Sequence, residues 1–238
     1  MDSTVVLVLI IFFISTFLRS VVGFGNALIA MPLLAVLLGI STATPLVALT
    51  GPLLSLGILL FDWKQVDLKS TWQLLLASIL GIPLGLLFLG SGSDELVTTI
   101  LAIILILFGT YSLFARQIPL LGDGWAFPFG FIAGVLGGAY NTNGPPIVVY
   151  SSLKRWNPDR FRGTLQGYFL PTGLLVAASH GLAGLWTTDV VRLFLYSIPV
   201  NIVALLAGNW LHQRIPEGKF DRLVYVLLIA LGIFLWLD

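Results

Sequence analysis

The sequence predicts an all-α polytopic membrane protein made of two inverted-topology repeats, with broken or re-entrant helices at the start of each half. Three observations predict this fold. Hydrophobic residues make up 58% of the 238 residues and charged residues only 10%, whereas a typical soluble domain has about 25% charged residues. The apolar residues form continuous blocks such as 74–89 and 223–237, unlike the alternating strands of a membrane barrel. Two polar, glycine-containing segments interrupt this pattern, one in each half of the chain.

The remaining composition excludes several functional classes. The net charge of +1 gives no electrostatic basis for binding nucleic acid. The chain contains no cysteine, which excludes disulfides and thiolate metal sites, and its two histidines, His180 and His212, lie far apart in the sequence. We therefore predict neither a metal nor a cofactor. No cleavable signal peptide is evident, because Met1 and Asp2 do not form a basic leader.

The hydropathy pattern predicts ten helical segments. A full crossing of a bilayer needs about 20 residues. Segments 27–38, 125–139 and 145–153 are shorter than that, so we expect half-helices or re-entrant pieces at these places. The ten predicted segments cover residues 4–22, 27–38, 43–61, 70–90, 95–114, 125–139, 145–153, 164–184, 190–212 and 221–237.

The two halves of the chain resemble each other, which predicts a first repeat over 1–115 and a second over 124–238. Trp63 and Trp186 lie 123 residues apart, and Gly109 and Gly232 have the same spacing. Near the start of each half the spacing is 114, and the difference places a nine-residue insertion in the basic segment 154–162. Internal repeats of this kind are common in transporters. Chance alignment of two Gly- and Leu-rich sequences is the alternative.

The distribution of basic residues predicts the topology. If the broken pairs 4–38 and 125–153 each enter and leave on the same side, ten basic residues share one face, only Arg192 lies near the other, and Arg19 lies within a helix. Lys and Arg concentrate in short cytoplasmic loops, so both termini are expected outside the cytoplasm and the repeats are inverted. The ten residues are Lys64, Lys69, Arg116, Lys154, Arg155, Arg160, Arg162, Arg214, Lys219 and Arg222.

The two polar segments are Gly23-Phe24-Gly25-Asn26 and Tyr140-Asn141-Thr142-Asn143-Gly144-Pro145-Pro146. Irregular backbone at membrane depth is tolerated only where protein buries it or where it lines a cavity, and paired breaks point to a transporter's binding site. The helix that follows each break directs free N–H groups inward, which favours an anion. The alternative is that these residues only cap and pack the helices. The candidate binding residues are Gly25, Asn26, Asn141, Thr142, Asn143 and Gly144.

Further polar residues lie within predicted helices. Arg19 precedes the first break by one turn; it either binds the anion or extends to the cytoplasmic interface. Gln166, Tyr168 and Thr50 complete the cavity or, alternatively, form hydrogen bonds between helices. The same two interpretations, a cavity residue or a hydrogen bond between helices, apply to Thr172. We expect His212 to be solvated in a loop beside Arg214, and no buried carboxylate proton relay is apparent, so the coupling ion stays open.

The motifs resemble a known family. The run Gly23-Phe24-Gly25-Asn26-Ala27-Leu28-Ile29-Ala30-Met31-Pro32 and the second-half Asn143-Gly144-Pro145-Pro146 are similar to the two repeat signatures of the sulfite-exporter (TauE/SafE) family. This resemblance covers essentially the whole chain. It implies a carrier in the bacterial cytoplasmic membrane for small sulfur-containing or organic anions, such as sulfite or sulfonates. The polar Asn141, Thr142 and Asn143 depart from the smaller, more apolar residues that are usual there, which leaves the substrate open.

Two other functional classes remain as alternatives. A membrane enzyme needs a nucleophile–base pair or a metal cluster, and the sequence shows neither. A scaffold subunit gains nothing from breaks repeated in both halves. The expected partners are therefore a small anion and the lipid bilayer, with another anion such as a carboxylate or sulfate as the alternative substrate. A homodimer is compatible with the sequence.

Overall fold

The computed structural model describes residues 3–88, 94–114, 120–140 and 143–237, and these residues form helices and no strand. Nine of the predicted segments agree with the structure to within a few residues. The helices are α1 (Ser3–Val22), α2 (Asn26–Leu38), α3 (Ile40–Asp62), η1 (Trp63–Gln65), α4 (Leu68–Phe88), α5 (Asp94–Phe114), η2 (Asp123–Trp125), α6 (Ala126–Tyr140), α7 (Gly144–Leu153), α8 (Pro158–Leu182), α9 (Thr188–His212) and α10 (Glu217–Leu237).

The predicted start of α8 at residue 164 is wrong, because the helix begins at Pro158. Asn157 caps it: the Asn157 side chain accepts a hydrogen bond from the backbone N–H of Arg160 at 2.9 Å. A capping Asn followed by Pro at the first helical position is a strong start signal. The basic segment 154–162 is therefore partly helical, and Arg162 lies inside α8 rather than in a loop.

The helix lengths separate full spans from short pieces. Three described helical stretches are long and apolar enough to cross a membrane: Ser3–Val22, Ser41–Gln65 and Thr188–His212. Helices α2, α6 and α7 contain 13, 15 and 10 residues. These lengths confirm the three short segments that the sequence predicts beside the two breaks.

The chain forms two compact units, and each unit takes helices from both halves of the sequence. Unit 1 comprises residues 1–71 and 162–214, and unit 2 comprises residues 72–161 and 215–238. The boundaries of the two compact units therefore differ from those of the proposed repeats, 1–115 and 124–238, which are defined by internal sequence similarity.

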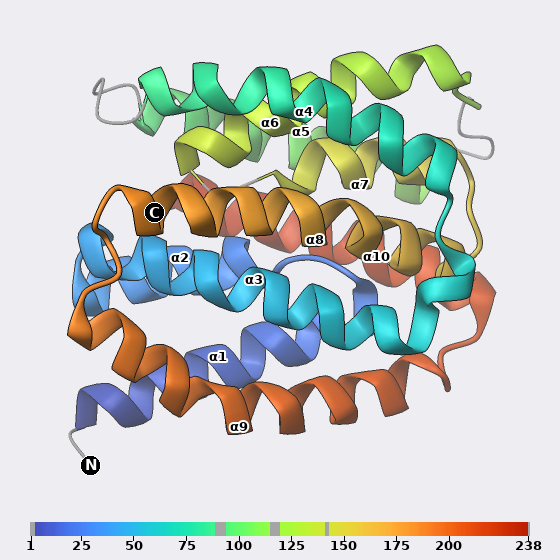
Figure 1. The fold of residues 1–238 in the computed structure, drawn as a ribbon. Helices are drawn as coiled ribbons and strands as arrows, with labels where there is room; N and C mark the ends of the chain where they lie inside the picture. The colour runs from blue at the N-terminus through green and yellow to red at the C-terminus, as the bar shows by residue number, and fades with distance from the viewer. Residues whose placement is uncertain (1–2, 89–93, 115–119, 141–142, 238) are drawn as a thin grey trace. The chain divides into compact units, whose positions relative to one another are not determined.

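In unit 1, α2 runs back along α1 (Figure 1). Phe12 from the first half of α1 packs in one buried cluster with Leu34 from the second half of α2, and with Ala43 and Val190 from the first turns of α3 and α9. The start of α1 and the end of α2 therefore lie at the same end of the unit. This is the hairpin arrangement expected for residues 4–38.

Parallel helices α1 and α9 pack through polar side chains in the same unit. The Thr16 hydroxyl donates to Asn201 Oδ1 at 2.7 Å, and the Ser20 hydroxyl donates to the Leu205 carbonyl at 2.7 Å. Small and polar residues allow the close helix approach that drives packing in a membrane. Helix α9 is thereby held against α1 along most of its length.

In unit 2, the second broken pair also returns to its starting end. Lys154, just after α7, lies 2.6 Å from the Asp123 carboxylate just before α6. The backbone N–H of Leu121 donates to the Leu153 carbonyl at 3.2 Å. These contacts place the end of α7 beside the segment that leads into α6.

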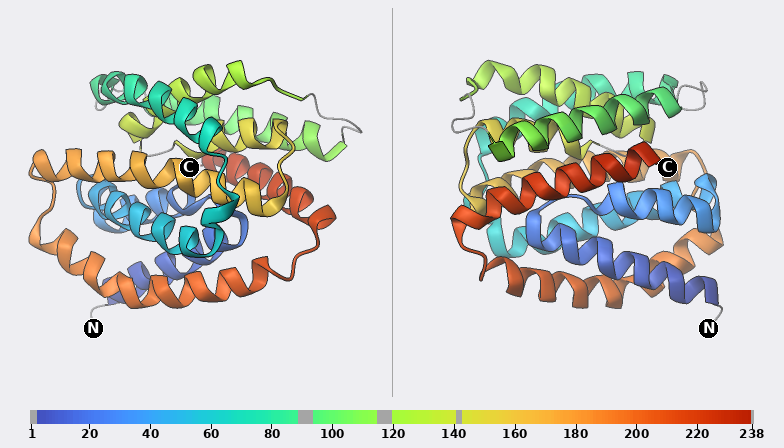
Figure 2. Two further views of the ribbon diagram at one scale, coloured as in Figure 1. Left: turned by 45° about the vertical axis from the view of Figure 1, so that its right-hand side comes forward. Right: turned by 180° about the vertical axis from the view of Figure 1, so that it is seen from behind.

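Helices α5 and α10 of unit 2 pack antiparallel (Figure 2) with reciprocal contacts. A Cβ on Gly109 would lie 2.8 Å from Ile229 Cγ1 and 2.9 Å from the Tyr225 carbonyl oxygen. A Cβ on Gly232 would lie 2.8 Å from Ile106 Cγ1 and 2.9 Å from the Ala102 carbonyl oxygen. Every residue of the second contact is 123 positions from its equivalent in the first. Such reciprocity is what a two-fold relation between repeats produces.

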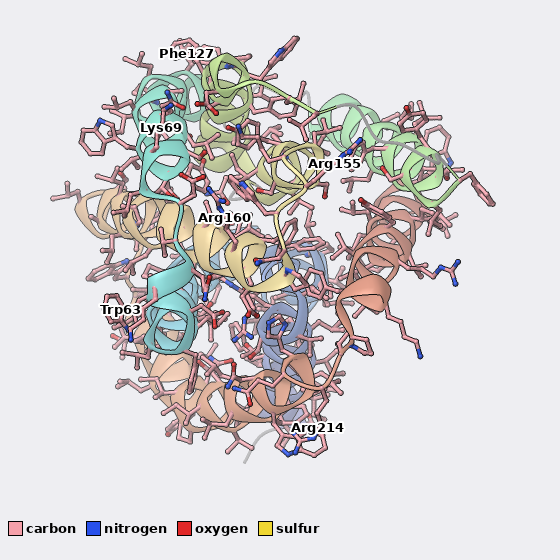
Figure 3. The ribbon with its side chains drawn as sticks, turned by 90° about the vertical axis from the view of Figure 1, so that its right-hand side faces the viewer. Trp63, Lys69, Phe127, Arg155, Arg160 and Arg214 are labelled. Atoms are coloured by element: carbon pink, nitrogen blue, oxygen red, sulfur yellow. The ribbon has the colours of Figure 1, made fainter. Side chains whose placement is uncertain are left out.

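Large aromatic side chains lie on the outside of the helices. Figure 3 shows Trp63 pointing away from unit 1, and its side chain is 63% exposed. Arg214, after α9 in the same unit, lies over the Trp210 ring, 3.8 Å from its centroid. Exposed tryptophans beside cations are typical of helix ends at a membrane surface. The six exposed tryptophans are Trp63, Trp72, Trp125, Trp186, Trp210 and Trp236.

The reciprocal α5–α10 contact predicts equal sensitivity at its two glycines. Gly109→Ala and Gly232→Ala should each destabilise the protein by about 1–3 kcal/mol, because backbone atoms must move to admit the methyl group. Thermal unfolding in detergent measures this. Gly51→Ala in α3 is the matched control, since nothing lies within 4 Å of its Cβ position. A loss at only one of the two positions would contradict the two-fold relation.

Candidate functional site

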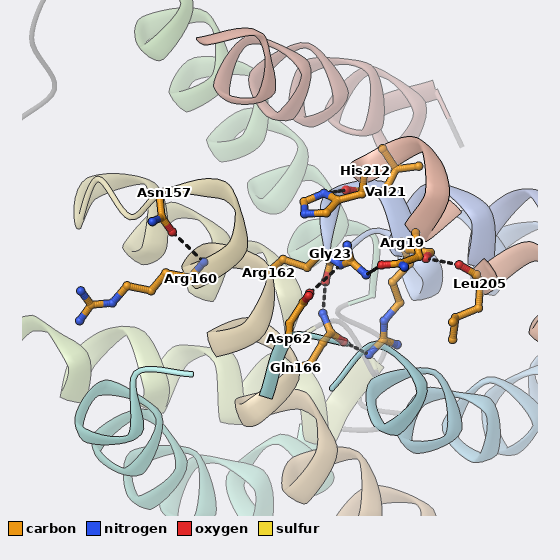
Figure 4. Close-up of polar contacts among 12 residues, drawn as sticks. Arg19, Val21, Gly23, Asp62, Asn157, Arg160, Arg162, Gln166, Leu205 and His212 are labelled. Carbon is orange, nitrogen blue, oxygen red and sulfur yellow. Dashed lines mark hydrogen bonds and ion pairs between the residues drawn. The ribbon is translucent and has the colours of Figure 1, made fainter. Parts of the chain in front are cut away.

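Arg19 lies in the last turn of α1, and its side chain is buried in unit 1 (Figure 4). Its Nη2 atom donates to Ser55 Oγ of α3 at 2.5 Å and to Gln166 Oε1 of α8 at 2.9 Å. The guanidinium also lies over the Phe169 ring, 5.3 Å from its centroid. Arg19 is 7% exposed, so it points into the unit and does not extend to an interface.

The charge of Arg19 is not balanced by a nearby acid. Its three contacts, with Ser55, Gln166 and Phe169, are all uncharged. Within the described residues it pairs with no carboxylate, and its buried Nε has no hydrogen-bond partner. An isolated buried charge is costly unless something compensates it. This arrangement therefore favours an anionic ligand beside Arg19.

The first break begins at Gly23, one turn after Arg19. Gly23 and Gly25 have φ angles of +92° and +97°, a left-handed conformation that glycine adopts without the strain of a Cβ. The Gly23 N–H still donates to the Arg19 carbonyl at 2.7 Å. Helix α1 thus ends with a left-handed residue, and Asn26 begins α2 directly after the second one.

Side chains from α8 and α9 satisfy the carbonyl groups at this end of α1. Gln166 Nε2 donates to the Gly23 carbonyl at 2.6 Å. His212 Nδ1 lies 2.8 Å from the Val21 carbonyl, and because a carbonyl can only accept, Nδ1 carries the proton. The expectation that His212 is solvated is wrong. The ring is buried because the end of α1 offers it an unpaired backbone acceptor.

A buried ion pair lies next to this cap. Arg162 of α8 is 0% exposed, its Nε is 3.0 Å from Asp62 Oδ2 at the end of α3, and its Nη2 donates to Asn209 Oδ1 of α9 at 2.7 Å. Asp62 is thus a buried carboxylate that the sequence analysis did not single out. Arg162 reaches the break as well, since a Cβ on Gly23 would lie 3.3 Å from Arg162 Cγ.

Asn26 lies at the first position of α2 and is 2% exposed. Its Nδ2 donates to Ser15 Oγ of α1 at 3.2 Å, and its buried Oδ1 has no partner. Gly25 precedes it as the left-handed N-cap residue and makes no side-chain cap. Both candidates therefore lie at the break.

Thr50 and Tyr168 lie elsewhere in unit 1. The Thr50 hydroxyl donates to the Val47 carbonyl of its own helix at 2.9 Å, and Thr172 donates to the Tyr168 carbonyl at 2.8 Å. The Tyr168 ring is fully buried and packs edge-on against Phe169, whose ring in turn contacts Arg19. Of the candidates Gln166, Tyr168 and Thr50, Gln166 is the one that accepts a hydrogen bond from Arg19 in the described structure.

The second break belongs to unit 2. Asn143 precedes α7 in a helical conformation and makes no side-chain cap. A Cβ on Gly137 of α6 would lie 3.0 Å from Asn143 Cβ, so Asn143 packs against α6. Gly144 is the first residue of α7. Asn141 and Thr142 lie outside the described residues.

Sequence reasoning missed five members of the buried polar cluster in unit 1. Polar residues inside apolar helices are themselves a functional signal, and this rule applies to Ser55 and Asn209. Asp62 directly follows an apolar run. A carboxylate at the end of such a run is also compatible with a solvated loop, so the sequence did not indicate that Asp62 is buried. No group of three or more His, Cys, Asp or Glu side chains in the described ranges is placed to hold a metal. The missed residues are Ser55, Asp62, Arg162, Asn209 and His212.

Comparison with known proteins gives consistent matches. Residues 7–235 match the profile of the family described as sulfite exporter TauE/SafE. The chain is 26% identical over 232 residues to the probable sulfite/organosulfonate exporter TauE of Cupriavidus necator. The aligned residues cover 93% of this chain and 90% of that protein. It is 25% identical over 191 residues to the probable inner membrane transporter protein TsaS of Comamonas testosteroni, covering 77% of this chain and 68% of that protein. No solved structure shows a significant match.

The two ion pairs predict different costs on truncation. Asp62→Ala should destabilise the protein by about 3–5 kcal/mol, because it leaves the charge of Arg162 buried without its partner. Asp123→Ala should cost only about 0–1 kcal/mol, since the side chain of Asp123 is 47% exposed beside Lys154. Unfolding in detergent measures both. Equal losses would show that the Asp62–Arg162 pair is not structurally distinct.

Proposed function

The chain belongs to the sulfite exporter TauE/SafE family, whose members named above are transporters and not enzymes, and on this premise we propose that it is a secondary carrier of small sulfur-containing or organic anions. Sulfite and sulfonates are the proposed substrates. This class agrees with the exporter name of the Cupriavidus necator relative. The proposed location is the bacterial cytoplasmic (inner) membrane.

The observation that carries the proposal is the buried, uncompensated Arg19 beside the first break. An ionisable residue within a membrane span marks a ligand or ion pathway by default. A guanidinium offers planar, paired donors that match the oxygens of a sulfonate or sulfite. Its unpartnered Nε is available to a ligand without breaking a bond to the protein.

The neighbouring break supplies a second kind of donor. Backbone N–H groups in the first turn of α2 have no partner within the helix, and the helix dipole favours negative charge there. Asn26 adds a neutral amide at the same point. Neutral donors and a single charge suit a carrier, because the ligand must be released as well as bound.

We propose that transport proceeds by alternating access around a mid-membrane site. In unit 1 the proposed site residues are Gly25 and Asn26 of the first break, with Arg19, Gln166, Tyr168 and Thr50. In unit 2 they are Asn141, Thr142, Asn143 and Gly144 of the second break. The reciprocal α5–α10 contacts support two inverted repeats over 1–115 and 124–238. Such repeats are the usual basis of alternating access.

A carrier of another small anion, such as a carboxylate or sulfate, is the second candidate function. The paired donors of Arg19 suit a carboxylate equally well. A non-transporting scaffold is disfavoured, because a structural subunit has no use for a buried charge without an acid. Flux into proteoliposomes across sulfite, sulfoacetate, sulfate and small carboxylates distinguishes the three.

Transport should depend on Arg19. Arg19→Gln should weaken anion affinity by roughly tenfold to a hundredfold, which is the value of a hydrogen bond to a charged group. Proteoliposome flux and calorimetry with sulfite or a sulfonate measure this. Arg192→Gln is the matched control, because Arg192 is exposed on α9 and lies beside Tyr196 of the same helix. Normal affinity in folded Arg19→Gln would remove the basis of the proposal.

The inverted topology places both termini in the periplasm. Asp159 and Asp189 are exposed acids in the first turns of α8 and α9, and the chain has no natural cysteine. In intact cells, an impermeant maleimide should label Asp189→Cys and not Asp159→Cys. Lysed cells, in which both should react, provide the control. Labelling of Asp159→Cys from outside would overturn the proposed orientation.

A further inference from the structure

We infer that the buried charges of unit 1 select a singly charged anion, and that Asp62 is the residue that sets this selectivity. The inference rests on the proposed function, since it takes an anion to bind beside Arg19. It goes further in assigning the charge of the ligand and a specificity role to a residue that does not itself contact the ligand.

In the described part of unit 1, the buried Asp, Glu, Lys and Arg side chains are Arg19, Asp62 and Arg162, at 7%, 8% and 0% exposure. The buried imidazoles of His180 and His212 are counted as neutral. Arg162 and Asp62 form an ion pair at 3.0 Å and neutralise each other. Arg19 has only uncharged partners. The cluster therefore carries one net positive charge.

The two arginines belong to one connected cluster. Gln166 contacts Arg19 and the Gly23 carbonyl, and Arg162, one turn earlier on α8, packs against Gly23. Figure 4 shows these side chains converging on the end of α1. Arg162 is therefore a second cation close to the break. Its positive charge is already paired with the Asp62 carboxylate.

The charge count decides which ligands fit. A monoanion beside Arg19 makes the cluster neutral, whereas a dianion leaves one negative charge uncompensated in a poorly solvated interior, where an unpaired charge is unfavourable. Sulfonates therefore satisfy the site. For sulfite, the bound species is the singly protonated form, hydrogensulfite. Sulfate, which carries two charges at neutral pH, is rejected.

Methanesulfonate and sulfate are matched probes of this selectivity, because both are tetrahedral and differ by a methyl group in place of a charged oxygen. The purified full-length protein in detergent should bind methanesulfonate at least about tenfold more tightly than sulfate, the factor expected for one charge-assisted interaction. Calorimetry at neutral pH measures both affinities. Tighter binding of sulfate by the unaltered protein would overturn the inference.

Asp62→Asn tests the role of Asp62 directly. The amide keeps the size of the side chain and an oxygen that accepts from Arg162, but it raises the net charge of the cluster to two. The preference for methanesulfonate over sulfate should fall by about tenfold or more, by the same measure. Added sulfate should also raise the melting temperature of this variant more than that of the unaltered protein. An unchanged preference in folded Asp62→Asn would refute the inference.

A second pair of variants tests the charge count without altering Asp62. Gln166→Glu places a carboxylate where Gln166 Oε1 now accepts from Arg19, which brings the net charge to zero. Gln166→Met removes the same hydrogen bonds and keeps the charge at one. Methanesulfonate binding should be lost in Gln166→Glu and only weakened in Gln166→Met. Equal losses would mean that charge is not the selecting property.

The outcomes separate this inference from the proposed function. If proteoliposomes of the unaltered protein transport sulfite while the methanesulfonate-to-sulfate preference is insensitive to Asp62→Asn, the carrier function stands and the inference is wrong. If the unaltered protein neither transports sulfite nor binds methanesulfonate or sulfate, the proposed function and the inference both fail.

Discussion

The broken end of α1 imposes a demand that organises unit 1, because its backbone carbonyl groups need hydrogen-bond donors where no water is available. The Val21 and Gly23 carbonyls receive them from His212 and Gln166. These side chains come from α9 and α8, so both helices must pack against the end of α1. A break that would be intolerable in an isolated membrane helix thus becomes the point on which three helices converge.

The same convergence explains the placement of charge. Arg162 lies one turn before Gln166, so docking Gln166 on Gly23 brings Arg162 into the interior, where Asp62 and Asn209 satisfy it. Arg19 precedes the break and is held by Ser55 and Gln166 without an acid, as far as the described residues extend. One arginine is therefore paired with an acid, and the other has uncharged partners among the described residues. Sequence position alone does not distinguish them.

Small and polar residues hold the helices together elsewhere. In a bilayer, burial of apolar side chains does not drive helices together, because lipid is equally apolar. The Thr16–Asn201 and Ser20–Leu205 bonds serve this purpose in unit 1, and the Ser78 hydroxyl donates to the Gly130 carbonyl at 2.6 Å in unit 2. Gly109 and Gly232 add the close approach of α5 and α10.

The sequence by itself determined the helical membrane class, the ten helices, the two breaks and the family resemblance, because hydropathy, chain length and glycine motifs are local properties. It indicated Arg19, Gln166 and Asn26 as candidate binding residues, because polar residues are unusual in apolar segments. Only the tertiary structure decided that Gln166 bonds both Arg19 and the Gly23 carbonyl, that His212 caps α1, and that Arg162 pairs with Asp62. These outcomes depend on partners from distant parts of the chain, as with the 191 residues between Val21 and His212. Hydrogen bonding and charge pairing between helices follow from packing, which no local pattern encodes.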